Sequence, residues 1–417
     1  MKRFKSIFLI ALRYYRHLGL RVCLYALLSL CIALASPLVV PFLGGQGYLD
    51  RIDFSAVMPV LTILATSMLA VSTFSLNVMV SAHRAAANAT TPRMHRLLLD
   101  DTTTQSVLAT FIGAFVFSLV TIVLYQAGFY AENAAVIVMA VSVFVVGLVI
   151  VSMLRWIPHL TNLGSVDNSL ALVTHRAKVA LAALARDPAF GAHPLTDDIR
   201  PPASVISLKA PASGYLQIVD VPGLQSLLPD QSSIHLRCRP GVHVLRGQVI
   251  AQVSGTVDAD VLTKLAAAFV LGEHRTFEQD AEFGLIVLSE IACKALSPGV
   301  NDPGTAIEAI TCLKTLLWQF ANLQTVAKSL SATRVYMPVP DCDGLCRAAF
   351  APIARDGAGA IEVVVCLGEA LRGLADVQNA EMARAACRML DDVIARNEAA
   401  DLQPYEADQL AQLARPA

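Results

Sequence analysis

The stretch AAVIVMAVSVFVVGLVIVSMLRWI, residues 134–157, decides the fold of this chain. Its first charged residue is Arg155, close to the end of the stretch. A helix needs about 20 mainly apolar residues to cross the roughly 30 Å hydrocarbon core of a bilayer. Because this stretch is longer than that and almost uncharged, it predicts a transmembrane helix.

Three more apolar stretches of similar length precede it, at residues 22–43, 57–80 and 107–129. None has a charged residue at its centre, where one such charge costs about 2.5–3.5 kcal/mol. The chain of 417 residues is only 16% charged, whereas soluble domains carry about a quarter. The deficit lies in the N-terminal part, so the sequence predicts an α-helical membrane domain of four transmembrane helices over residues 1–160.

The Lys and Arg residues near the ends of these stretches predict the orientation. One side of the membrane has Lys2, Arg3, Lys5, Arg13, Arg16, Arg21, Arg84, Arg93, Arg96, Arg155, Arg176 and Lys178. The two loops on the other side hold only Arg51. Such residues are enriched in cytoplasmic loops, so both termini are predicted to be cytoplasmic. A cleaved signal peptide ending near Ala33–Ser36 is the alternative, although the apolar sequence continues through Leu43.

The second predicted helix carries a polar stripe, which consists of Ser67, Ser75, Asn77 and Ser81. The serines fall roughly on one side of a helix. The stripe is interpreted either as a pore lining or as helix packing, where small polar residues let backbones approach. No Asp or Glu lies within the predicted spans, which argues against a proton-coupled transporter. Trp156, beside Arg155, is typical of an interfacial anchor.

The rest of the chain is predicted to be a cytoplasmic α+β part. A helical connector and linker, 161–203, precedes a small β-module, 204–257, and a helical bundle, 258–417. The module resembles the barrel-sandwich hybrid of biotinyl and lipoyl carriers, because apolar runs alternate with Gly- and Pro-containing turns at 210–215 and 240–250. Those carriers need a lysine at the following hairpin tip, and residues 254–259 have none, so no attached cofactor is expected.

Neither a metal site nor nucleic-acid binding is expected. The nine cysteines are irregularly spaced, and the closest pair, Cys342 and Cys346, has no CxxC partner. His235 and Cys238 have opposite parity in a predicted strand and therefore point to opposite faces. The net charge is −1, which provides no field that would attract nucleic acid.

Residues 272–306 are the most distinctive part of the predicted helical region. The candidate ligand residues are His274, Arg275, Gln279, Asp280, Ser297, Asn301, Asp302 and Thr305. A helix starting at Asp302-Pro303 has a favourable N-cap and first residue, and its N-terminus, with His274 and Arg275 nearby, is one possible anion site. The structural alternative is a well-capped helical hairpin in which Arg275 pairs with Asp280 or Glu282.

No catalytic motif is present: the sequence has no Walker loop, dinucleotide fingerprint, HExxH or GxSxG. The protein is therefore expected not to be an enzyme. A catalytic carboxylate pair drawn from Asp280, Glu282 and Glu290 stays open as an alternative.

The stretch ALSPGVNDPGTA, residues 295–306, is similar to the signature of DUF2254, a family of bacterial predicted membrane proteins. Further similar pieces are Pro92-Arg93, Ser213-Gly214-Tyr215 with Gln217 and Asp220, Gln279-Asp280 and Phe283-Gly284. Gly304 and His243 depart from the family pattern, which more often has a larger and an acidic residue there. The resemblance implies a bacterial inner-membrane protein and supplies no activity.

Three functions are compatible with these features. The first is an oligomeric channel or pore with a cytoplasmic vestibule, embedded in the lipid bilayer as a homo-oligomer. The alternative is a membrane-anchored cytoplasmic sensor or scaffold that binds a small anion or a protein partner. The third is an enzyme built around His274, Asp280, Glu282 and Asn301, which lacks a nucleophile constellation.

Overall fold

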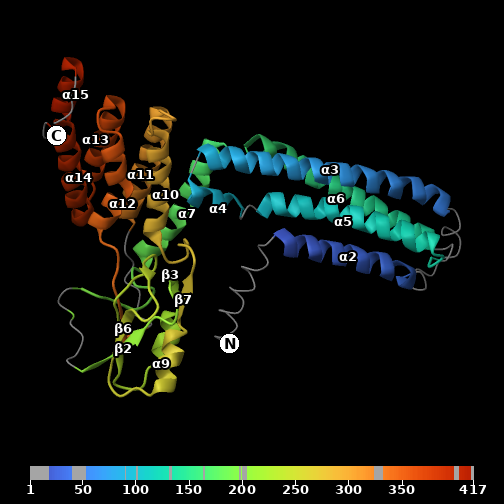
Figure 1. The fold of residues 1–417 in the computed structure, drawn as a ribbon, viewed down its shortest axis with the longest axis horizontal. Coiled ribbons are helices and arrows are strands. Elements are labelled where there is room, and N and C mark those ends of the chain that lie inside the picture. Colours follow the sequence, from blue (N-terminus) through green and yellow to red (C-terminus); the bar gives the residue numbers. More distant parts are fainter. Residues whose placement is uncertain are drawn as a thin grey trace. The chain divides into compact units, whose positions relative to one another are not determined.

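The computed structural model describes residues 18–39, 53–89, 91–99, 102–130, 134–162, 165–196, 199, 204–323, 332–398 and 403–414. The chain divides into two compact units. The membrane unit comprises residues 1–88 and 92–168, and the α+β unit comprises residues 89–91 and 169–417. The protein is mostly helical, and all of its β-strands lie in the second unit (Figure 1).

The described helices of the membrane unit are α2 (Leu18–Val39), α3 (Phe54–Ala89), α4 (Pro92–Leu99), α5 (Thr102–Gln126) and α6 (Ala135–Asn162). Phe54, at the start of α3, is part of its core. The Phe54 ring stacks on the Tyr125 ring, with 4.3 Å between the ring centroids. The outer surface is apolar: Ile63 and Leu154 are each 66% exposed. Exposed side chains of this kind on long apolar helices suit contact with lipid rather than water.

Three helices are long and apolar enough to cross a membrane, over Phe54–Ala82, Thr103–Gln126 and Ala135–Leu160. They contain the second, third and fourth predicted spans except for the last residues of the third and the first residue of the fourth. The first predicted span, 22–43, lies on α2, but residues 40–43 are outside the described residues. The apolar stretch found in α2 is shorter, Cys23–Ile32, so the first predicted span stays a prediction.

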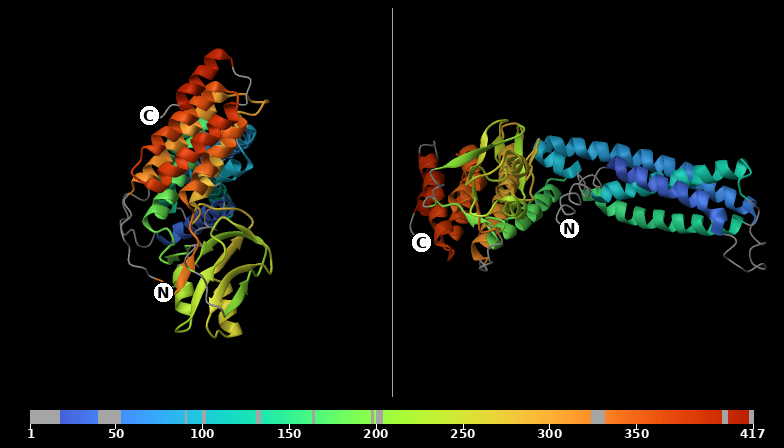
Figure 2. Two further views of the ribbon diagram at one scale, coloured as in Figure 1. Left: turned by 90° about the vertical axis from the view of Figure 1, so that its left-hand side faces the viewer. Right: turned by 90° about the horizontal axis from the view of Figure 1, so that it is seen from below.

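The α+β unit contains two sheets (Figure 2). The five-stranded sheet has the order β1 (His193–Pro194), β8 (Val335–Met337), β4 (Ser233–Leu236), β6 (Val249–Ser254) and β2 (Val205–Lys209). The three-stranded sheet has the order β5 (His243–Val244), β3 (Gly214–Val219) and β7 (Phe269–Gly272). Their shared core includes Leu216, Ile234, Leu236 and Val253.

The predicted boundaries of the β-module were too narrow. The sheets include β1 from the predicted linker, and β7 and β8 from the region predicted to be entirely helical. β8 joins in parallel with β4, and Ile234 N donates to Arg334 O at 2.9 Å. Strands of two to four residues are too short to show an alternating pattern, so distant pairing rather than local sequence defines them. The two-sheet arrangement does not establish the barrel-sandwich resemblance.

The helices of this unit are α7 (Val166–Arg186), α8 (Val221–Leu227), α9 (Ala259–Ala266), α10 (Ala281–Ala295), α11 (Pro303–Asn322), α12 (Cys342–Asp356), α13 (Ile361–Ala375), α14 (Ala380–Glu398) and α15 (Pro404–Ala414). Helices α10 to α14 pack side by side as a bundle. Helix α7 approaches α10 closely, because a Cβ on Gly284 would lie 2.4 Å from the Ala177 Cβ.

Candidate functional site

Two glutamine side chains attach the segment before α10 to strand β3. Gln217 Nε2 donates to the carbonyl oxygen of His274 at 2.6 Å. Gln279 Oε1 accepts from Val219 N at 2.8 Å, and its Nε2 donates to Val219 O at 3.2 Å. Each side-chain amide therefore bonds a backbone group that a neighbouring strand would otherwise pair. These bonds hold residues 273–280 against β3.

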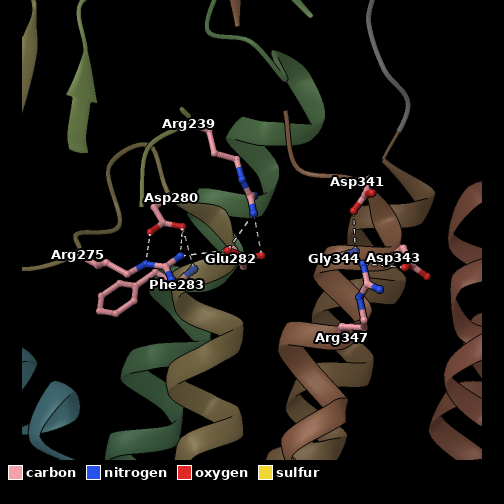
Figure 3. Close-up of polar contacts among 9 residues, drawn as sticks. All are labelled: Arg239, Arg275, Asp280, Glu282, Phe283, Asp341, Asp343, Gly344 and Arg347. Carbon is pink, nitrogen blue, oxygen red and sulfur yellow. Dashed lines mark hydrogen bonds and ion pairs between the residues drawn. The ribbon is translucent and has the colours of Figure 1, made fainter. Parts of the chain in front are cut away.

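An ion cluster, consisting of Arg239, Arg275, Asp280 and Glu282, lies beside this attachment (Figure 3). Arg275 Nε donates to Asp280 Oδ2 at 2.7 Å, and its Nη2 donates to Asp280 Oδ1 at 2.9 Å. The same Nη2 lies 3.2 Å from Glu282 Oε2. Arg239 Nη2 reaches the two oxygens of Glu282 at 3.2 and 3.4 Å. Glu282 is thus shared between two guanidinium groups.

Asp280 is the most buried member of the ion cluster, with 4% of its side chain exposed. It also caps α10, because its Oδ1 accepts from Phe283 N at 3.1 Å. Burial raises the pKa of Asp280, and the hydrogen bonds and charge of Arg275 oppose that rise. Removing one partner from such a buried pair costs about 3–5 kcal/mol because the other charge is left uncompensated.

Gly241 allows the turn after β4 to cover this ion pair. Its φ is +93°, a conformation that favours glycine. A Cβ at Gly241 would lie 2.3 Å from Asp280 Oδ2 and 2.9 Å from Arg275 Nη2. The sheet turn and the start of α10 therefore meet at a contact that leaves no room for a side chain.

A small pocket opens beside the ion cluster. Its free volume is about 20 Å³, room for about one water molecule. Arg239, Glu278, Gln279, Asp280 and Glu282 form its polar wall, and its apolar wall contains Phe190, Met337, Pro240, Pro338 and Pro340. The pocket lies within the α+β unit, and Arg239 is one of its lining residues.

The second half of the predicted candidate site lies elsewhere. Asp302 caps α11, with Oδ1 accepting from Thr305 N at 3.1 Å and Oδ2 from Thr305 Oγ1 at 2.6 Å. The Ser297 hydroxyl donates to Lys294 O in the preceding turn at 2.6 Å. Asn301 is exposed and has a φ of +49°. These contacts are local, as expected for a capped helical hairpin.

The expected proximity of His274 and Arg275 to Asn301 is wrong. They precede α10, whereas Asn301 follows it, and this helix of 15 residues is about 22 Å long. The His274 side chain is half exposed and lies 4.0 Å from Glu273. Asp280 and Glu282 lie together in the ion cluster. Asn301, which the enzyme alternative placed beside them, lies at the other end of α10.

Sequence reasoning missed Arg239 and the role of Gly241. Arg239-Pro240-Gly241 was recognised only as a turn. The sequence shows that an Arg precedes a Pro-Gly turn. Its partner, Glu282, is 43 residues further along the chain, and no local pattern identifies it. Gln217 was noticed only through the family resemblance, and Gln279 was predicted as a candidate ligand residue rather than as an attachment to β3.

Potential metal ligands do not converge in the part of the chain that the structure describes: no group of three or more His, Cys, Asp or Glu is found there. Cys342 and Cys346 are both buried. Burial raises the pKa of Cys342 to about 11 and that of Cys346 to about 12, which keeps both thiols protonated near neutral pH. Cys346 Sγ contacts Met382 Sδ at 3.5 Å.

In the membrane unit, the residues of the polar stripe differ in burial. Ser75 is buried and Ser67 half-buried, whereas Asn77 and Ser81 are exposed. The Ser67 hydroxyl donates to Ile63 O of its own helix at 2.6 Å. Ser75 Oγ and Ser72 Oγ are buried and have no hydrogen-bond partner among the described residues. The side chains of the stripe therefore lie in different environments within a single chain.

Trp156 is not the interfacial anchor that the sequence predicted. It is 5% exposed and packs in one apolar cluster with Met68 of α3 and Val107 of α5. Its indole Nε1 has no hydrogen-bond partner among the residues that the structure describes. The aromatic ring faces the bundle interior, and the neighbouring Arg155 faces outwards.

A family model described as "Predicted membrane protein (DUF2254)" matches residues 16–373. The chain belongs to the DUF2254 family. This confirms the resemblance drawn from residues 295–306. Similar relatives are an uncharacterized protein of Mycobacterium bovis and one of Mycobacterium tuberculosis, each 27% identical over 261 residues, or 60% of this chain and 50% of the relative. The chain spans about half the length of these curated relatives. No solved structure matches it.

Replacing Gly241 in this DUF2254 protein tests the contact over the ion pair. Gly241→Ala should lower the free energy of unfolding by about 3 kcal/mol, because it adds a strained φ and a clash with Asp280. Gly247→Ala is the matched control: its φ is +84°, but a Cβ there meets nothing within 4 Å. Thermal unfolding of the full chain in detergent compares the two. Equal losses would contradict the close approach.

Replacing Asp302 distinguishes a structural cap from a ligand group. Asp302→Ala should lower the free energy of unfolding by about 1 kcal/mol at neutral pH, and Asp302→Asn by less, because Asn also caps helices. The hydrogen bonds from Thr305 hold the pKa of Asp302 below its usual 3.8. Its contribution is therefore present above that value and lost as pH falls through the lowered pKa. Thermal midpoints measured at pH 7 and pH 3 should show a smaller difference at pH 3.

Proposed function

We propose that this protein is a membrane-anchored sensor or scaffold whose α+β unit binds a small anion at Arg239. It acts without catalysing a reaction. The proposal rests on the position of Arg239, whose guanidinium lines the pocket and is 30% exposed on its side chain. Among the members of the ion cluster it is the most accessible, so it is the charge that a ligand can reach.

The pairing within the ion cluster supports this choice of ligand. Asp280 is held by two hydrogen bonds from Arg275, whereas Arg239 has only Glu282 as an ion-pair partner among the described residues, and Arg275 also contacts Glu282. A carboxylate or phosphate oxygen can replace Glu282 at Arg239, since guanidinium groups bind both in the same two-pronged geometry.

A thermal-shift panel of small carboxylates and phosphates tests this proposal on the full chain. A ligand at about 100 times its Kd adds roughly 2.7 kcal/mol of stability to the folded state. Arg239→Gln should weaken binding at least tenfold, because a charge-assisted hydrogen bond contributes about 1.5–3 kcal/mol. Arg237→Gln is the control, since Arg237 is exposed and two residues away. Equal shifts in wild type and Arg239→Gln would contradict the site.

A second candidate function, an oligomeric channel in the bacterial inner membrane, is favoured by buried polar atoms in the membrane unit. Ser72 Oγ, Ser75 Oγ and Trp156 Nε1 are buried and have no hydrogen-bond partner in the described part of the chain. Polar atoms in hydrocarbon are costly unless a partner or water satisfies them. In this proposal, water or a second copy of the chain meets these groups, and both termini are cytoplasmic.

Flux through reconstituted vesicles tests the channel. Wild-type protein should release a small polar solute faster than empty vesicles, and Ser75→Ala should slow release several-fold by removing an unpartnered hydroxyl. Ser67→Ala is the matched control, because the Ser67 hydroxyl is already bonded within its own helix. Flux equal to that of empty vesicles would rule out the channel while leaving the anion site intact.

A further inference from the structure

Three polar side chains in the interior of the membrane unit keep hydrogen-bonding atoms unused. Ser72 Oγ, Ser75 Oγ and Trp156 Nε1 are buried and find no hydrogen-bond partner among the described residues. Ser75 is only 3% exposed and Trp156 only 5%. A buried polar atom without a partner is costly, so these atoms are the clearest indication of a binding site in this unit.

Four other hydroxyl groups of α3 are used within their own helix. Each donates to a carbonyl oxygen four residues earlier at 2.6 to 2.9 Å, and they belong to Thr62, Thr66, Ser67 and Thr73. This is a common arrangement for Ser and Thr inside helices. Ser72 and Ser75 depart from it, so their hydroxyl hydrogens are available to an acceptor from outside α3.

Two apolar clusters define how the three spans run beside one another. The first turns of α3 and α6 share one cluster with the end of α5, and their later turns share another with its start. α3 and α6 therefore run parallel to each other and antiparallel to α5. The register is given by two contacts: the stacked rings of Phe54 and Tyr125, and Thr104 Oγ1 at 3.1 Å from His159 Nε2.

Counting along the helices from these contacts brings polar groups of all three spans to one level. Ser75 comes 21 residues after Phe54 on α3. Thr104 comes 21 residues before Tyr125 on α5. Because each residue advances a helix by the same distance, Ser75 lies at about the level of Thr104, and so of His159.

The other two unpartnered groups form the adjacent layer. Trp156 comes three residues before His159 on α6, and Ser72 lies three residues before the polar level on α3. This layer is therefore about 4.5 Å away along the axis. Ser75 projects from the side of α3 that carries Met68, since seven residues make nearly two turns. Met68 and Trp156 belong to one cluster, so the unpartnered atoms gather between the spans.

The chemistry of this polar site, consisting of Ser72, Ser75 and Trp156, favours an anion. An indole N–H can only donate, and each hydroxyl has one hydrogen to donate. The three candidate spans contain no Asp or Glu, and a histidine such as His159 is never negative. A cation would therefore find no counter-charge there, whereas an anion can accept hydrogen bonds from all three groups.

We propose that the polar site binds a small monovalent anion of the halide class inside the membrane unit. The inference rests on the channel proposed above, for which it names the permeating ion. A halide is a single atom, so donors on α3 and α6 can approach it from different sides. It takes the place of water at the indole N–H and the two hydroxyls, with Thr104 and His159 at the border of the site.

Iodide quenching of tryptophan fluorescence tests the site on the full chain in an uncharged detergent. The chain has two tryptophans, so Trp318→Phe leaves Trp156 as the only reporter. Iodide should quench its fluorescence saturably, chloride should compete with iodide, and caesium, a cationic quencher, should have little effect. Quenching that rises only linearly with iodide concentration, as random collisions produce, would overturn the site.

A matched pair of variants on this background tests the hydroxyl groups. Ser75→Ala should raise the iodide concentration for half-maximal quenching at least about tenfold, because it removes a hydrogen bond to a charged group. Ser118→Ala should stay within about twofold of the background, since Ser118 is also buried but its hydroxyl donates to Ala114 O at 2.8 Å. Equal half-saturation in the two variants would contradict the assignment.

The stability of the Ser75→Ala variant provides a check on folding. Removing a hydroxyl that has no partner should not destabilise the chain, so the thermal midpoint in halide-free buffer should equal that of the background. Added chloride should then raise the midpoint of the background more than that of Ser75→Ala. The same rise in both proteins would place any bound halide elsewhere and overturn the site.

Ion flux in reconstituted vesicles separates this inference from the channel itself. Chloride efflux should exceed potassium efflux, and Trp156→Phe, which keeps an aromatic ring but removes the N–H, should lower that preference. Saturable iodide quenching without flux of either ion would reject the channel and keep the anion site. Equal chloride and potassium flux without saturable quenching would keep the channel and reject the anion site.

Discussion

The buried ion pair between Arg275 and Asp280 is the interaction on which the α+β unit depends. It joins the start of α10 to the turn that carries Gly241, and Asp280 also caps the helix. The two glutamine attachments hold the segment before α10 against β3, beside this pair. Breaking the pair would leave a charge in a site that water hardly reaches, so packing between sheets and helices is coupled to a single polar contact.

The same coupling explains why the candidate binding site lies at this point. A pocket between a sheet turn and a helix start is lined by groups whose partners come from distant parts of the sequence. Arg239 shares Glu282 with Arg275, and a ligand that displaces Glu282 changes the balance of charge around Asp280. The structural cluster and the proposed sensor site therefore share one set of residues, and in the proposed function a ligand acts directly on the contact between sheets and helices.

The membrane unit follows a different constraint. Its polar side chains mostly satisfy themselves: Ser118, Thr121 and Ser142 donate to carbonyl oxygens four residues earlier. Among the described residues, this leaves Ser72, Ser75 and Trp156 as unpartnered polar groups inside. These groups motivate the channel as a second candidate function.

The sequence by itself determined the three long apolar helices, the helix caps and the family. These depend on local composition or on residues close in the chain, as with Asp302 and Thr305. It also predicted that Arg275 pairs with Asp280 or Glu282, five and seven residues away. Only the tertiary structure decided the meeting of Arg239 with Glu282, the need for Gly241 and the place of β8 beside β4. It also separated His274 from Asn301 and turned Trp156 inwards, because such positions depend on contacts between segments far apart in sequence, which no local pattern encodes.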